Sequence, residues 1–147
     1  MTGLIDRLER ITMAGAIAAL ALLVLLGLAE VVLRPLGASL AFATEYAGYL
    51  TGLAFVWGLG PAMSARAHVR VALAAGRLGP VAEGIALLVS ALAAWAMLDW
   101  AITSLEQGAR SYFPSRTPLW LPQILFAWGL AMLVLSVLKR LLARSWN

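Results

Sequence analysis

"TPLWLPQILFAWGLAMLVLSVL", residues 117–138, is the longest stretch of this chain without a charged side chain. It has 22 residues, and a helix needs about 20 apolar residues to cross the ~30 Å hydrocarbon core of a bilayer. Lys139, Arg140 and Arg144 follow it, and cations are favourable at the negative end of a helix dipole. The stretch therefore predicts a transmembrane helix whose C-terminal end reaches water.

Three more uncharged runs precede this one, at residues 11–29, 46–65 and 84–98. The first run is longer than the ~7–15-residue apolar region of a signal peptide, so we interpret it as a permanent span. The fold class predicted is all-α, an integral membrane bundle of four transmembrane helices. It forms a single membrane domain over residues 1–147, with approximate spans at 11–33, 45–64, 80–105 and 118–140.

Composition argues against most catalytic and binding classes. Apolar residues make up 63% of the chain and charged residues 12%, with a net charge of +4. The charges form short clusters between apolar runs, which is typical of membrane proteins with basic loops and not of nucleic-acid binders. With no cysteine and one histidine, we expect no metal site and no cofactor. We also expect no catalytic residue, no substrate-binding residue and no nucleic-acid partner.

The basic residues are distributed unequally between the two sides. Eight would lie on the side of the termini and three on the opposite side, and basic residues accumulate on the cytoplasmic side of membrane proteins. Both termini are therefore predicted to be cytoplasmic. The eight are Arg7, Arg10, Arg66, Arg70, Arg77, Lys139, Arg140 and Arg144, and the three are Arg34, Arg110 and Arg116.

Three tryptophans are predicted to lie near the middle of the bilayer. At 1.5 Å per residue, Trp57 lies ~18 Å from Glu45, and Trp95 and Trp128 each lie ~15 Å from the outer end of their helix. A buried indole N–H needs an acceptor, so we predict that these side chains face protein and contact a partner. The alternative, that they fill the core of this chain, stays open.

The acidic residues fall near helix ends. Glu30, Glu83 and Asp99 are all expected at an interface, which leaves no charge at mid-membrane and makes an ion path inside this chain improbable. Gly48 and Gly52 form a GxxxG pattern in the second helix, which permits close contact with another helix.

"SARAHVRVALAAG", residues 64–76, gathers Arg66, Arg70 and the only histidine, His68. No acid or nucleophile accompanies His68, so catalysis is not expected there. The segment is predicted to orient the chain and to contact membrane phospholipids or a partner protein.

Two segments resemble a known family, the DctQ-like small membrane subunits of tripartite ATP-independent periplasmic (TRAP) transporters. "EYAGYLTGLAFVWGLGPAMSARAHVRV" is similar to the family's second helix and the His-containing element after it. "TPLWLPQILFAWGLAMLVL" is similar to the opening of its last helix. Ala72 departs from the pattern, where an aspartate is usual. The matching positions are Glu45, Arg66, His68, Arg70, Trp120 and Pro122.

The resemblance implies a small scaffold subunit in a bacterial inner membrane. Its implied partners are a large TRAP permease subunit and a periplasmic solute-binding protein, which together import organic acids by an ion gradient. An alternative is a glutathione-dependent membrane enzyme of the MAPEG type, but "LERITMAG" offers only Glu9 and Arg10 before the first helix, and not the set expected on the second helix. A small multidrug exporter is a third interpretation, but Glu30 lies too close to a helix end.

Overall fold

The structure is a computed structural model that describes residues 2–64 and 79–144. In these residues the regular structure is helical, as predicted. Helix α1 is followed by the short 3₁₀ turn η1, and then by α2, α3 and α4. Their bounds are α1 Thr2–Leu33, η1 Arg34–Leu36, α2 Ala43–Ser64, α3 Gly79–Glu106 and α4 Trp120–Arg144.

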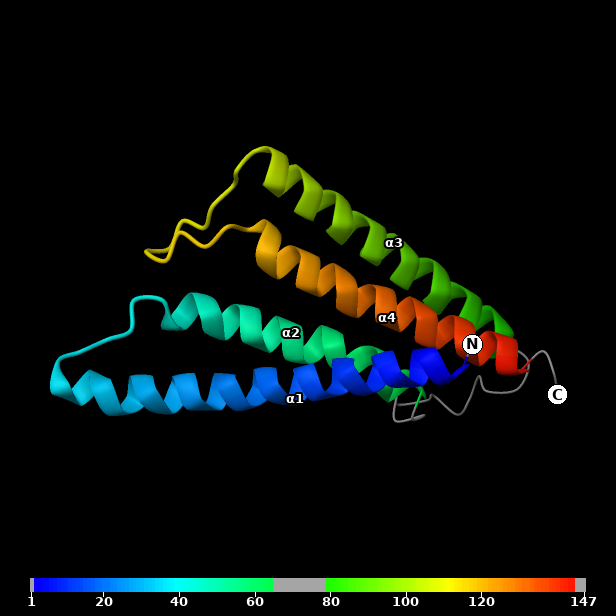
Figure 1. Ribbon diagram of the computed structural model, residues 1–147, viewed down its shortest axis with the longest axis horizontal. Coiled ribbons are helices and arrows are strands. Elements are labelled where there is room, and N and C mark those ends of the chain that lie inside the picture. Colours follow the sequence, from blue (N-terminus) through cyan, green and yellow to red (C-terminus); the bar gives the residue numbers. More distant parts are fainter. Residues whose placement is uncertain (1, 65–78, 145–147) are drawn as a thin grey trace.

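The four helices lie side by side in an order that differs from their order in the chain. Helix α1 packs on α2, α2 packs on α4, and α4 packs on α3 (Figure 1). The helices converge at the end that holds the start of α1 and the end of α4, and diverge toward the other end (Figure 1). The first and last helices of the chain therefore begin and end on one side of the bundle.

In the described part of the chain, three helices are long and apolar enough to cross a membrane. These stretches are Gly3–Leu36, Val81–Glu106 and Trp120–Leu142. Helix α2 has 22 residues, enough for about 33 Å of helix, but its glycines, tyrosines and Pro61 make it less apolar. It lies between α1 and α4, and Gly52 and Gly60 are in contact with α4.

The core between the helices consists mainly of small side chains, with Met132 and Val137 of α4 as the largest that are fully buried. Ala16, Ala19, Ala101 and Ala127 are buried, whereas most large aliphatic side chains of α1 and α3 are exposed. Lipid provides no hydrophobic reward for bringing helices together, so close approach of small residues and interhelical hydrogen bonds must hold them. The exposed aliphatic surface is what a membrane-embedded protein presents to lipid or to another subunit.

Candidate functional site

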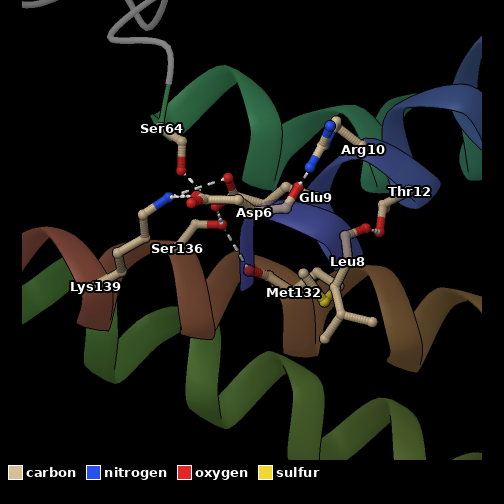
Figure 2. Close-up of polar contacts among 9 residues, drawn as sticks. All are labelled: Asp6, Leu8, Glu9, Arg10, Thr12, Ser64, Met132, Ser136 and Lys139. Carbon is tan, nitrogen blue, oxygen red and sulfur yellow. Dashed lines mark hydrogen bonds and ion pairs between the residues drawn. The ribbon is translucent and has the colours of Figure 1, made fainter. Parts of the chain in front are cut away.

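A polar cluster joins three helices at the end that holds the termini. Glu9 of α1 is only 8% exposed, and one of its carboxylate oxygens accepts hydrogen bonds from Ser64 of α2 and from Ser136 of α4, the latter at 2.8 Å (Figure 2). Its other oxygen lies 3.3 Å from the ammonium group of Lys139. Lys139 also pairs with Asp6. Both carboxylate oxygens of Glu9 therefore have donors, which is the condition for burying a charge at low cost.

Arg140 extends this cluster toward α3. Its Nε atom lies 3.3 Å from a carboxylate oxygen of Glu83, and one of its terminal nitrogens donates to the sulfur of Met63 on α2 at 3.4 Å. Because Lys139 and Arg140 are adjacent on α4, this helix binds the ends of α1, α2 and α3 through two consecutive cations. We call Asp6, Glu9, Ser64, Glu83, Ser136, Lys139 and Arg140 the inner cluster.

A second polar cluster lies at the opposite end. Glu45, at the start of α2, is 4% exposed. It accepts hydrogen bonds from Tyr49, at 2.8 Å, and from Ser115 in the connection between α3 and α4. Thr117 bonds to Ser115 at 2.9 Å and donates to the hydroxyl of Tyr46 at 3.3 Å. We call Glu45, Tyr46, Tyr49, Ser115 and Thr117 the outer cluster.

The outer cluster fixes the connection 107–119 as a hairpin against α2. The amide of Ser111 donates to the carbonyl of Thr117 at 2.9 Å, and the amide of Leu119 donates to the carbonyl of Ala109 at 3.1 Å. Arg116 adopts a positive φ of 47°, a conformation that non-glycine residues rarely adopt. Buried Glu45 thus determines where this hairpin lies.

The two clusters are separated by about the thickness of a bilayer core. Glu45 and Ser64 are 19 residues apart on α2, or about 28 Å of helix. On α1, Glu9 and Glu30 are 21 residues apart, or about 32 Å. Glu30 accepts hydrogen bonds from the Ser39 hydroxyl at 2.7 Å and the Leu40 amide at 2.9 Å. Ser39 and Leu40 belong to the connection between α1 and α2, so Glu30 lies at the outer level. Helix α2 therefore has the span of a transmembrane helix although it is less apolar than the others.

Trp57 packs among helices of this chain. Its indole nitrogen donates to the backbone carbonyl of Leu125 in α4 at 2.8 Å. Its ring lies against Gly15 of α1, where an added Cβ would be 2.1 Å from a ring carbon, and against Gly129 of α4, where the distance would be 2.6 Å. The alternative weighed above, a tryptophan in the core of this chain, describes Trp57.

The other predicted tryptophans are placed differently. Trp95 on α3 is 68% exposed and Trp128 on α4 is 43% exposed, while Trp120 is half-buried at the start of α4. The structure thus does not bring the three mid-membrane tryptophans together. For Trp95 and Trp128, contact with a partner stays a prediction.

The glycines of the GxxxG pattern also differ. A Cβ at Gly52 would meet the ring of Phe126 at 2.9 Å, so this glycine permits the contact of α2 with α4, whereas Gly48 has nothing within 4 Å. Gly60 lies in the same contact, close to Ser136 and the Met132 carbonyl. Gly48 remains available to a partner or to lipid.

Three predicted residues lie outside the described residues, namely Arg66, His68 and Arg70. Their predicted role in orientation and in lipid or partner contact stays a prediction. In the described ranges 2–64 and 79–144, His, Cys, Asp and Glu residues form no group of three that could hold a metal ion.

Sequence reasoning did not assign the inner cluster. It treated Lys139 as a helix-end charge and Glu9 only as a candidate glutathione ligand. One signal was available, because Asp6, Glu9 and Thr12 are spaced by three residues and so share one face of α1. Thr12 is fully buried and bonds to the Leu8 carbonyl at 2.8 Å.

Comparison with known families agrees with this architecture. The family model of the DctQ component of tripartite ATP-independent periplasmic transporters matches residues 23–146. Curated proteins and solved structures gave no match to the chain. The family match extends from the last third of α1 through α4, and covers the outer cluster and the α2, α3 and α4 parts of the inner cluster. This chain therefore belongs to the DctQ family, the small membrane components of tripartite ATP-independent periplasmic transporters.

Proposed function

We propose that this chain is a static scaffold beside a large permease subunit in the inner membrane of a bacterium. In this assembly the permease and a periplasmic solute-binding protein import organic acids by an ion gradient. The family match carries the proposal. It is a family of transporter components and not of enzymes, which favours this function over a glutathione-dependent enzyme.

The placement of the charged groups supports a scaffold function. The acidic residues of α1 and α2 lie in or beside the inner and outer clusters. Asp6, Glu9 and Glu45 connect different parts of the chain there. No charged residue occurs between 11 and 29, between 46 and 64, or between 117 and 138. A path for an ion or an organic acid through a membrane protein is marked by ionisable residues facing its interior. We therefore propose that the permease carries both the substrate and the coupling ion.

The orientation proposed follows from the charge count and the common side of the termini. The inner cluster then faces the cytoplasm, and the hairpin 107–119 faces the periplasm, where the solute-binding protein would approach. The segment with Arg66, His68 and Arg70 connects α2 and α3 on the cytoplasmic side. Anionic phospholipids are its proposed contact.

Reconstitution tests this function. The permease is placed in liposomes with and without this chain, the binding protein and an organic acid are added outside, and uptake is measured with an imposed sodium gradient. We expect uptake only when all three proteins are present. Uptake by this chain alone, or equal uptake by the permease without it, would contradict the proposal.

A further inference from the structure

Helix α3 has one face that packs on α4 and another that nothing in the described chain covers. Ser90, Ala101 and Ser104 are buried against α4. Asp99 follows Ser90 by nine residues, or two and a half turns, so it lies on the opposite side of the helix. It is exposed. Trp95 precedes Asp99 by four residues and so shares its face. The carboxylate and the indole therefore both point away from this protein.

The position of Asp99 along α3 can be compared with the levels of the two polar clusters. It follows Glu83, a member of the inner cluster, by 16 residues, or about 24 Å of helix. It also precedes Glu106, the last residue of α3, by seven residues, or about 10 Å. In Figure 1, α3 ends before it reaches the level at which α2 begins, and the hairpin 107–119 covers the remaining distance. The ~24 Å between Glu83 and Asp99 is shorter than the ~28 Å that separates the inner and outer clusters along α2, so Asp99 lies inside the outer level and not at it.

Neither side chain has a partner in the described residues. Asp99 makes no ion pair or hydrogen bond there, and the Trp95 indole, unlike that of Trp57, donates to no acceptor. An ionised carboxylate in hydrocarbon is expensive and is found paired or facing a polar interior. An unpaired indole N–H in the same region is unfavourable for the same reason. Lipid chains can supply neither a cation nor an acceptor at this depth.

A second copy of this chain is a poor occupant. In a two-fold contact the same surface serves both protomers, so a contact of α3 with α3 would bring Asp99 toward Asp99. Like charges are destabilising, most of all where water is absent. The face instead fits a helix that carries a lysine or arginine and, one turn away, a carbonyl or hydroxyl acceptor.

We propose that the Asp99 face of α3, made by Leu88, Leu92, Trp95, Asp99 and Ile102, is the docking surface for the large permease subunit. A lysine or arginine of the permease pairs with Asp99 inside the membrane, and a permease acceptor receives the indole N–H of Trp95. The inference rests on the proposed function, because it assumes that the permease is the partner. It adds which helix makes the contact and what chemistry the partner must present.

Co-purification from co-expressing cells tests it. Removing one member of a desolvated charge pair should weaken association by at least ~30-fold, so Asp99→Asn and Asp99→Lys should both lose the permease while the chain still folds. Glu106→Gln, an exposed acid at the end of the same helix, is the matched control. Trp95→Phe should weaken association less than Asp99→Asn, with Trp100→Phe, an exposed tryptophan elsewhere on α3, as its control.

The outcomes separate this inference from the proposed function. If the unaltered chain does not retain the permease, the proposed function fails. If it does and the Asp99 variants retain the permease equally well, the docking surface is wrong and the function stands. The paired cation can be identified by charge reversal. Replacing that lysine or arginine of the permease with an acidic residue should abolish binding of the unaltered chain and restore binding of the Asp99→Lys variant.

Photo-crosslinking identifies the occupant directly. A photoreactive amino acid at Leu92, three residues from Trp95 on the same face, should crosslink to the permease. The same group at Val24, exposed on α1, should crosslink to lipid only. Crosslinking of Leu92 to a second copy of this chain, or to lipid alone in the assembled complex, would overturn the proposal.

Discussion

Substituting Gly15 by alanine should destabilise the contact between α1 and α2. A Cβ at Gly15 would lie 2.1 Å and 2.3 Å from two carbons of the Trp57 ring, far inside van der Waals contact. The ring cannot withdraw easily, because its nitrogen bonds to Leu125 and its other edge lies against Gly129. Overpacking of this kind costs about 1–3 kcal/mol, against a gain of at most ~1 kcal/mol in helix propensity. We expect a net loss of up to about 2 kcal/mol, and a loss of about 1–3 kcal/mol relative to the same substitution at a glycine with free space around it.

The assay is reversible unfolding in mixed micelles of mild detergent and dodecyl sulfate, followed by far-ultraviolet circular dichroism. Gly27→Ala on the same helix is the control, because a Cβ there has nothing within 4 Å. A leucine at position 57 lacks the six-membered ring that a Cβ at Gly15 would meet. Trp57→Leu should therefore be destabilising by itself but should remove the penalty of Gly15→Ala. The reasoning is refuted if Gly15→Ala is as stable as Gly27→Ala, or if its penalty is the same in both backgrounds.

Three further outcomes are expected. Glu9→Gln should lower the free energy of unfolding by about 2 kcal/mol, because Lys139 loses a charged partner, whereas Glu106→Gln should leave it unchanged; equal losses would contradict the inner cluster. Glu45→Gln should accelerate amide hydrogen exchange in the hairpin 107–119 and leave the helices protected, and unchanged exchange would show that this carboxylate does not hold the hairpin. A reporter fused after Asn147 should be active only in the cytoplasm and one in the hairpin only outside, and the reverse pattern would contradict the orientation.

Helix positions were predictable from sequence because the lipid bilayer imposes one length on every span. Charged residues at 10, 30, 45 and 139 bound uncharged runs of about that length, so the helices follow from counting. The N-terminal extension of α1 to Thr2 did not follow, because residues 2–10 carry four charges and look like a solvated tail. In the structure they are helical, and Asp6 and Glu9 contact Lys139, which is 133 and 130 residues away.

The tryptophans show why the candidate site was only partly predictable. Depth depends on position along one helix, and counting placed Trp57, Trp95 and Trp128 near mid-membrane. Direction depends on which helices are neighbours, and this follows from pairs such as Trp57 with Gly15 and Gly129. Such pairs are far apart in sequence and have no signature in a single chain. For the same reason a count along α3 alone cannot show how Asp99 lies relative to the ends of the other helices, and its depth stays a prediction.

The order α1, α2, α4, α3 has a consequence for how the ribosome and the insertion machinery make this protein. Helices α2 and α3 emerge one after the other, but α4 lies between them in the finished layer (Figure 1). Until α4 has been synthesised, α3 has no helix of this chain to pack on, and the cations that bind Glu9 and Glu83 do not yet exist. The decisive step of assembly therefore waits for α4, and a nascent chain that stalls before residue 120 would hold α3 in the bilayer apart from α1 and α2. Such a chain would present Glu9 without the ammonium group of Lys139 to the quality-control proteases of the membrane.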